Sequence, residues 1–334
     1  MGRLLSKLPT DVHLGKFLLI STVFGCLDPA LTIAATLNSK SPFVAPLGLE
    51  QEADRAKNSF RVENSDFLTI HNAFSSWRRA CANPGIVRKF CRSNFLSHQN
   101  LQQIEDLRQQ FLGYLIDSSF IQVDKSLVRE LSRARYSRNR TRFVTVPSEL
   151  DVNSNKPALI HAALAAGLYP KILSIDAKTG KLLTISNNQA ASFHPTSVNF
   201  GRNALDFGVS YLTYFTLMHS KKLYAWETGP VDDLSILLLC GEADHKLISD
   251  SVSIDRKIRF SIPPKTHIAL KILREKINAI LAQQYQGRAL TDMQLKWMET
   301  CLLALSKIKL AAADEPAIGI RLVSETQPLT ASRS

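Results

Sequence analysis

The sequence predicts an α+β fold, with an N-terminal all-helical bundle, then a small β-barrel, then C-terminal helices. Two observations predict this division. Apolar residues recur at three- and four-residue spacing through the first part of the chain, as on the buried face of a helix. From Tyr169 to Ile262 the pattern changes to short alternating runs rich in β-branched and aromatic residues, which is typical of strands. The 334 residues are enough for two domains.

Residues that typically break or cap helices predict where the helices of the bundle begin and end. Residues 14–37 indicate two buried helices with a break at Gly25, where Asp28 is the expected N-cap and Pro29 the first helical residue. Asp66 is the expected N-cap of a later helix. Ser97 is expected to cap a helix with a clear apolar stripe and a polar face. These later helices are expected at Glu50–Phe60, Asp66–Ala82, Ile86–Asn94 (short and basic) and Leu101–Ile116, the last with Arg108 and Gln109 on its polar face.

The second half begins with an alanine-rich helix, Pro157–Gly167, and then turns to strands. The strand-like runs are Lys171–Ile175, Lys181–Ile185, Val209–His219, Leu223–Glu227, Leu234–Cys240 and Ile254–Ile262. Ala191–Phe200 is also strand-like but contains Pro195, so we expect an edge or a bulge there. Amphipathic helices are expected at His267–Gln284 and Thr291–Lys307, followed by a loose tail.

Charge favours a polyanionic partner. The formal net charge is +12, which points to nucleic acid, although many globular proteins are basic without a specific reason. Arginines cluster in Arg129–Arg142, between Ser, Asn and Thr residues, and we expect a flexible loop there. The loop is either a solvated linker or an arm that contacts phosphate through its arginines. The candidate arm residues are Arg133, Arg135, Arg138 and Arg140.

Known catalytic motifs are missing from the printed sequence. It contains no Gly-x-x-x-x-Gly-Lys-Ser/Thr loop, no acidic metal motif after an apolar strand, no His-Glu-x-x-His and no Gly-x-Ser-x-Gly. Ser192, His194 and Ser197 are neighbours without a positioned acid, and His161 on its alanine-rich helix is expected to be a packing residue. We therefore expect neither catalysis nor a bound metal or cofactor in this chain.

Cysteine usage and hydropathy indicate the cellular compartment of the protein. The five cysteines form no Cys-x-x-Cys pair, so neither a zinc site nor a disulfide framework is expected, and a reducing compartment fits. No uninterrupted apolar window of about 18 residues exists for a membrane span. We expect a cytoplasmic protein, with the nucleus as the alternative, and no membrane partner.

A small barrel with basic hairpins is a common platform for single-stranded nucleic acid. Lys221 and Lys222 should lie on the turn between two strands, and Lys171 begins another strand. Aromatic residues of the same sheet can stack on bases or fill the barrel core, and both roles stay open here. These aromatics are Tyr169, Tyr214, Tyr224 and Trp226.

Several motifs together resemble the helicase-associated domain and OB-fold of DEAH/RHA-type ATP-dependent RNA helicases. The motifs are Leu8-Pro-Thr-Asp-Val-His-Leu-Gly-Lys-Phe, Phe24-Gly-Cys-Leu-Asp-Pro-Ala-Leu, Phe90-Cys-Arg-Ser-Asn-Phe-Leu-Ser, Ala163-Leu-Ala-Ala-Gly-Leu-Tyr-Pro-Lys, Phe193-His-Pro-Thr-Ser-Val-Asn and Ile236-Leu-Leu-Leu-Cys-Gly. The resemblance covers about residues 2–282. It implies a ratchet-like bundle over residues 1–125, a basic linker over 126–156, an OB-fold over 157–285, and a helix with a flexible tail over 286–334.

The resemblance also implies a function and partners. It implies an accessory module that contacts single-stranded or structured RNA beside a RecA-like helicase core, present in cis or in trans. ATP and Mg²⁺ are expected only in the RecA-like domains, whose P-loop and DEAH box are absent from this sequence. Two alternatives stay open, a platform that docks the helicase core or an activator protein, and a fragment of a complete helicase. The implied RNA-contacting residues of the OB-fold are Lys171, His194, Thr196, Ser197, Asn199, Lys221 and Lys222.

Overall fold

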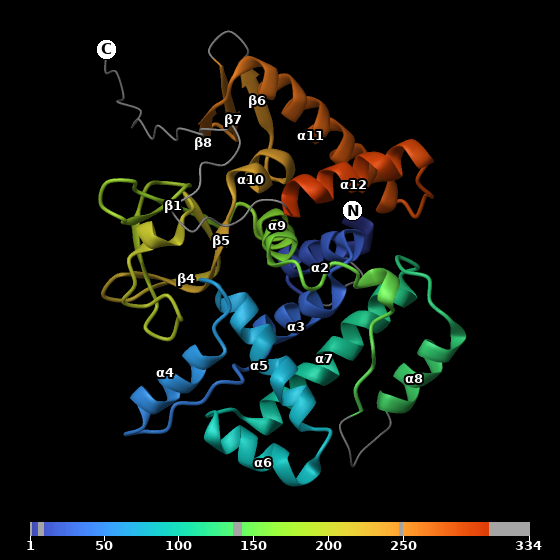
Figure 1. Cartoon of the computed structure of the whole chain (residues 1–334), viewed down its shortest axis with the longest axis vertical. Helices are drawn as coiled ribbons and strands as arrows, with labels where there is room; N and C mark the ends of the chain where they lie inside the picture. The colour runs from blue at the N-terminus through green and yellow to red at the C-terminus, as the bar shows by residue number, and fades with distance from the viewer. Residues whose placement is uncertain (1, 6–9, 136–141, 247–249, 307–334) are drawn as a thin grey trace.

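A computed structural model of the chain describes residues 2–5, 10–135, 142–246 and 250–306 (Figure 1). Helices lie at the bottom and right of Figure 1, and the strands lie at the left and top. The expected α+β fold, with a helical N-terminal part, a barrel and C-terminal helices, is confirmed. The N-terminal helices are α1 (Gly2–Leu5), α2 (Val12–Phe24), α3 (Leu27–Leu37), α4 (Glu50–Ser59), α5 (Asp66–Ala80), α6 (Pro84–Ser93), α7 (His98–Asp117) and α8 (Lys125–Arg135).

The ends of these helices correct two expected caps. Helix α3 begins at Leu27, and Asp28 lies inside its first turn, where its carboxylate pairs with Arg108 at 2.5 Å. The N-cap of α5 is Ser65, whose hydroxyl accepts from the Leu68 N–H. Asp66 is therefore the first helical residue, and its carboxylate is available to other segments.

The structure also corrects the expected polar face of α7. Ser97 caps it as expected, but Arg108 and Gln109 are buried and do not form a solvent-exposed face. Arg108 donates to the Glu105 carboxylate at 3.1 Å and to Asp28 at 2.5 Å, and Gln109 donates to Glu105 at 3.0 Å. Mutual pairing compensates the cost of burying these charges, which explains why polar residues point into the bundle.

The structure also corrects the expectation for the arginine-rich segment. The expected loop over Arg129–Arg142 is wrong for its first half, because α8 extends to Arg135. Arginine is a good helix former, and the serines between the arginines did not prevent a helix. Residues 136–141 lie outside the part of the chain that the structure describes.

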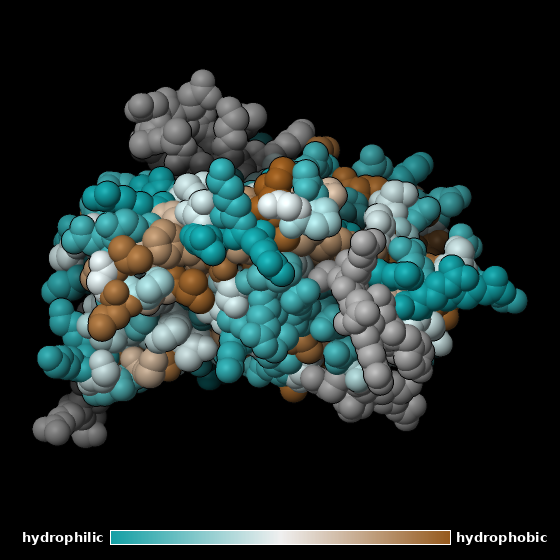
Figure 2. All heavy atoms as spheres, turned by 90° about the horizontal axis from the view of Figure 1, so that it is seen from below, coloured by the Kyte–Doolittle hydropathy of each residue, from teal (hydrophilic) through white to brown (hydrophobic). Residues whose placement is uncertain are grey.

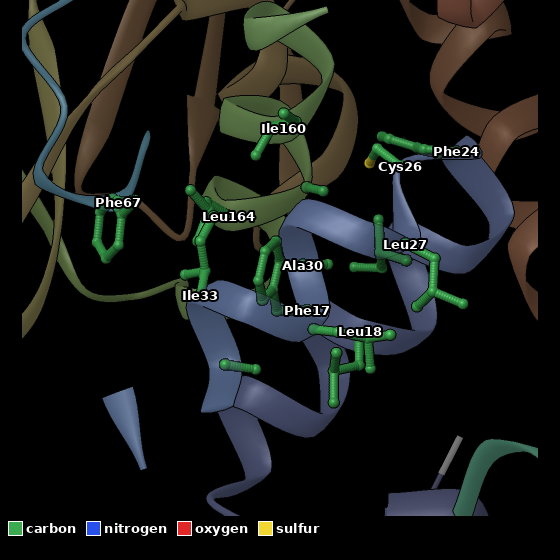
Figure 3. Close-up of a cluster of buried hydrophobic side chains, with 14 of the residues drawn as sticks. Phe17, Leu18, Phe24, Cys26, Leu27, Ala30, Ile33, Phe67, Ile160 and Leu164 are labelled. Carbon is green, nitrogen blue, oxygen red and sulfur yellow. The ribbon is translucent and has the colours of Figure 1, made fainter. Parts of the chain in front are cut away.

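Helix α9 (Pro157–Leu168) lies at the centre of the molecule and joins the bundle to the barrel (Figure 1). It packs directly on α2, because Gly167 lets the two backbones approach closely, and a Cβ built at Gly167 would lie 2.6 Å from the Phe17 Cβ. Each fully buried large apolar side chain here contributes about 1.5–3 kcal/mol through the hydrophobic effect. Figure 3 shows this cluster, which includes Phe17, Leu18, Leu27, Ala30, Ile33, Ile160 and Leu164.

The barrel is closed in the order β1-β2-β3-β5-β4, with β3 and β5 parallel and the other pairs antiparallel. Its inner face carries apolar residues such as Leu173, Leu212 and Ala225, all fully buried. The expected edge strand at Ala191–Phe200 is wrong. The strand β3 has partners on both sides and ends at Phe193, before Pro195, and a turn follows. The strands are β1 (Ile172–Ile175), β2 (Leu182–Thr184), β3 (Ala190–Phe193), β4 (Tyr211–His219) and β5 (Leu223–Val231).

Beyond the barrel, one expected strand is a helix, and another is a strand only over its second half. Leu234–Cys240 is mostly the helix α10 (Asp233–Leu239), because Asp232 caps its N-terminus by accepting from the Leu234 N–H at 2.7 Å. Ile254–Ile262 is the turn and second strand of a hairpin in a separate sheet made of β6 (Ala243–Lys246), β7 (Ser251–Ile254) and β8 (Ile258–Ser261). The last elements are α11 (Pro264–Gln284) and α12 (Asp292–Ser306), close to the expected ranges. In the described part of the chain, no helix is both long enough and apolar enough to cross a bilayer.

Candidate nucleic-acid interface

The bundle and the barrel meet at the N-terminus of α5. The Asp66 carboxylate is 3% exposed and accepts from three barrel residues. Its partners are the Ser197 hydroxyl at 2.6 Å, the Val198 N–H at 2.9 Å, and the Thr228 N–H at 2.9 Å and hydroxyl at 3.2 Å. Charge-assisted hydrogen bonds of this kind are roughly twice as strong as neutral ones. Asp66 therefore fixes the segment after β3 against the bundle.

Asn199 extends this network. Its amide donates to the Asn64 carbonyl and to the Thr228 hydroxyl, both at 2.9 Å. Asn199 is fully buried and Ser197 is 9% exposed. The structure thus places these two predicted RNA-contacting residues in the joint between bundle and barrel, where they shape the neighbouring surface.

A groove of about 300 Å³ opens beside this joint, between α4 and the segment after β3. We call it the junction groove. The Lys57 ammonium donates to the Thr196 carbonyl across it and lies 4.9 Å from the centre of the Phe43 ring. Its lining residues are Asp54, Lys57, Asn58, Arg61, Pro195, Thr196, Ser197, Val198, Phe200 and Arg202.

The junction groove is positively charged. Burial and the neighbouring Arg61 both lower the pKa of the Arg202 guanidinium, which indicates that the two cations lie close together. Arg202 is held by the Asn64 side-chain oxygen at 2.6 Å. Phe200, also in the lining, is 54% exposed. Two close guanidinium groups favour an anion between them, and an exposed ring beside them can stack on a planar group.

Three aromatic side chains, which we call the aromatic trio, lie on β5 and just after β3. The His194 ring stacks on Trp226 with centroids 3.7 Å apart and meets the edge of Tyr224 at 5.7 Å. All three are partly exposed. Parallel pairing sets this arrangement, because Ser192 pairs with Tyr224 and the His194 N–H donates to the Ala225 carbonyl.

His194 is a neutral part of this surface. Its Nδ1 accepts from the Thr196 N–H at 3.2 Å and lies 2.8 Å from the Thr196 hydroxyl. Partial burial and the nearby Lys57 lower its pKa, and Asp66 opposes this shift. The imidazole is therefore neutral at pH 7 and presents its face to Trp226.

Glu227 lies between the trio and the joint. It has a positive φ of 45°, and it does not pair with Phe215, although the register of β4 and β5 is the same on both sides of it. Burial, reinforced by the charge of Asp66, raises the pKa of its carboxyl to about 7, while Lys57 acts in the opposite direction. Part of the population is thus uncharged near neutrality, which reduces the negative charge beside the junction groove.

The remaining predicted residues are dispersed. Lys221 and Lys222 are exposed on the turn between β4 and β5, as expected. Lys171 lies beside Phe215, with its ammonium 4.8 Å from the ring centre. Arg133 is exposed on α8, Arg135 ends that helix, and Arg138 and Arg140 lie outside the described residues.

These groups form an ordered path along β3 and β5. The exposed turn with Lys221 and Lys222 precedes Leu223, which pairs with Ala191 at the start of β3. From Leu223 the strand leads past Tyr224 and Trp226 to Glu227, about 13 Å at roughly 3.3 Å per residue. The junction groove follows the end of β3. Cations therefore stand at both ends of an aromatic surface, and we call this path the β3–β5 track.

The sequence alone did not predict four residues of the junction groove, namely Lys57, Arg61, Arg202 and Phe200. Lys57 lies in the last turn of α4, and Arg61 lies two residues after the helix ends at Ser59. Nothing in the sequence indicated that these two cations lie near Arg202, which comes from a barrel loop. In the described part of the chain, no group of three or more His, Cys, Asp or Glu side chains could hold a metal ion.

Two family descriptions match this architecture. The helicase-associated domain (HA2), described as ratchet-like, matches residues 11–70, and an oligonucleotide/oligosaccharide-binding (OB)-fold matches residues 160–243. The chain is thus a helicase-associated, ratchet-like region joined to an OB-fold.

The relatives that match most of this chain are helicases. The chain is 30% identical over 326 residues to the ATP-dependent DNA/RNA helicase DHX36 of Homo sapiens, a match that covers 95% of this chain and 30% of that protein. It is 31% identical over 296 residues to the ATP-dependent RNA helicase DHX29 of Homo sapiens, covering 86% of this chain and 20% of that protein. It is also 31% identical over 294 residues to the DExH-box ATP-dependent RNA helicase DExH1 of Arabidopsis thaliana, a match that covers 87% of this chain and 27% of that protein. The chain corresponds to the C-terminal helicase-associated and OB-fold region of DEAH-box helicases, and it spans 30% or less of the length of these three relatives.

Proposed function

We propose that this chain is a nucleic-acid-binding accessory module of a DEAH-box helicase and that it holds single-stranded RNA along the β3–β5 track. The observation that supports the proposal best is the aromatic trio between two sets of cations, because single-strand sites combine a basic groove with aromatic stacking surfaces. In this proposal Lys221, Lys222, Arg61 and Arg202 contact phosphates. The trio and Phe200 contact bases.

The names of the relatives agree with the choice of ligand, since they describe helicases that act on RNA or on DNA and RNA. We propose that ATP and Mg²⁺ act in RecA-like domains, in cis or in trans, and that this chain contributes strand binding. The compartment stays a prediction, namely the cytoplasm, with the nucleus as the alternative.

The proposal is tested by titrating labelled single-stranded RNA with the chain at several salt concentrations. Each phosphate contact on a single strand adds about 0.7 to the slope of log affinity against log salt, so Lys221→Gln with Lys222→Gln should lower the slope by about 1.4. The double variant should bind RNAs of different sequence more weakly by about the same factor. A control pair on α11, Lys271→Gln with Lys276→Gln, should change little. Absence of binding at low salt, or binding that salt does not weaken, would refute the proposal.

A second candidate function is a docking platform for the helicase core or an activator protein. Apolar side chains exposed on α11 and on the loop before α4 favour it, with Ile268 54%, Ile272 41% and Leu47 98% exposed. The test is co-purification with a separately expressed RecA-like core. A complex that Ile268→Ser with Ile272→Ser disrupts would support it, and no complex with the parent chain would exclude it.

A further inference from the structure

Helix α6 lies in a segment of the chain without acidic residues. No Asp or Glu occurs between Asp66 and Glu105, while five Lys or Arg residues do. One of these, Arg78, is paired with Asp28 at 3.3 Å. The other cations have no ion-pair partner among the described residues. The positive charge of this segment is therefore neutralised by an ion pair only at Arg78 among the described residues.

The cations of α6 point away from the protein core. Val87 and Cys91 are buried against the bundle, whereas Arg88, Lys89 and Arg92 are exposed. Asn83 fixes the start of the helix by accepting from the Gly85 N–H at 3.1 Å, and Pro84 is its first residue. The three cations thus form a basic face on a well-capped helix.

Helix α6 packs beside the end of α4, which forms one wall of the junction groove. Phe90 of α6 packs edge-on against Phe60 at the end of α4, with ring centroids 6.4 Å apart. Phe43, which lies under the Lys57 ammonium, forms a β-bridge with Leu96 just after α6. Figure 1 shows α4 and α6 at the bottom of the molecule, and Figure 2 shows that side with hydrophilic residues over much of it.

We propose that α6 is a second phosphate-contacting surface, which takes the part of the strand that leaves the junction groove. This inference rests on the proposed function. Its ligand is the phosphodiester backbone, contacted by Arg88, Lys89 and Arg92 without base readout. The helix has ten residues, about 15 Å at 1.5 Å per residue, which matches roughly four stacked nucleotides at 3.4 Å each.

An acidic protein segment fits this surface less well. A bound amphipathic helix needs an apolar groove as well as complementary charge. Of the apolar residues on α6, Val87 and Cys91 are buried and Ile86 is 52% exposed. A single exposed isoleucine beside three cations suits a polyanion that runs along the surface. The position of α6 beside α4, one wall of the junction groove, favours nucleic acid as that polyanion.

Strand length separates this surface from the β3–β5 track. We would measure binding of single-stranded RNAs of about 6 and about 14 nucleotides, within the site sizes typical of OB-folds, to the parent chain and to Arg88→Gln/Lys89→Gln/Arg92→Gln. The variant should bind the long RNA at least tenfold more weakly, with a salt slope lower by about 2, and the short RNA within twofold of the parent. Glutamine is a good helix former, and unchanged thermal unfolding would show that α6 is intact.

The matched control is Lys265→Gln/Lys271→Gln/Lys276→Gln on α11, which removes the same charge at the opposite end of the view in Figure 1. It should leave the binding of both RNAs within twofold of the parent. Unchanged binding of the long RNA to the α6 variant would overturn the inference and leave α6 as a surface for an acidic protein. Equal losses in the α6 variant and the control would also overturn it. Failure of the proposed function looks different, because the parent chain would then bind neither RNA.

Discussion

Asp66 is the residue on which the joint between bundle and barrel depends most. Replacing it with alanine leaves the Val198 N–H, the Thr228 N–H and the Ser197 hydroxyl without their acceptor in a buried place. An unsatisfied buried donor costs about 1–3 kcal/mol, and partial access of water reduces the sum, so we expect a loss of about 4 kcal/mol in local stability. Asp66→Asn keeps one acceptor oxygen and should cost about 2 kcal/mol.

Hydrogen exchange measured by mass spectrometry reports this loss directly. The segments 194–203 and 225–231 contain the freed donors, and 4 kcal/mol corresponds to an increase of about a thousandfold in their exchange through local opening. Asp117→Asn, an exposed carboxylate on α7, is the control and should exchange like the parent. Unchanged protection of both segments in a folded Asp66→Ala protein would refute the assignment of Asp66 as the joint.

Two further predictions concern buried positions around α9. His161 is 2% exposed with no hydrogen-bond partner for either ring nitrogen, and burial lowers its pKa from 6.5 to about 3. The neutral, buried imidazole therefore costs no stability above pH 6.5, but the free energy of unfolding falls as the pH drops towards 3, by about 1.4 kcal/mol at pH 5.5. His161→Leu should remove this part of the pH dependence, measured by urea unfolding at pH 7.5 and 5.5. The same pH dependence in the parent and the variant would contradict this prediction. Gly167→Ala should destabilise by about 3 kcal/mol in the same assay, since its Cβ would meet the Phe17 backbone at 2.7 Å, whereas the control Gly85→Ala, with 3.4 Å to its nearest neighbour, should be neutral or stabilising. Equal stabilities of the two glycine variants would contradict the close approach of α9 and α2.

Local signals predicted most of the helices correctly. Gly25 ends α2 in a left-handed conformation with φ 68°, and Ser97 caps α7, both as expected. The strand prediction at Leu234–Cys240 is wrong because a short apolar run fits a buried helix and a buried strand equally well. The two aspartates before it, Asp232 and Asp233, are the capping signal that distinguishes them.

The candidate site could be predicted only in part. His194, Lys221 and Lys222 were predicted because polar and basic residues stood out within one strand-rich segment, and the structure places all three along the β3–β5 track. Ser197 and Asn199 belong to the same motif, yet their partners are Asp66 and Asn64, more than a hundred positions away. The junction groove likewise needs α4 and a barrel loop together. Such contacts depend on tertiary packing, which no local pattern records.

The central claim is that a single strand lies along the β3–β5 track. Photo-crosslinking of single-stranded RNA that carries a photoreactive base, followed by mass spectrometry of the linked peptides, tests it most directly. We predict crosslinks to the aromatic trio at His194, Tyr224 and Trp226 and to Phe200, with competition by unlabelled RNA. Efficient crosslinks confined to other parts of the chain, with these residues unlabelled, would contradict the account.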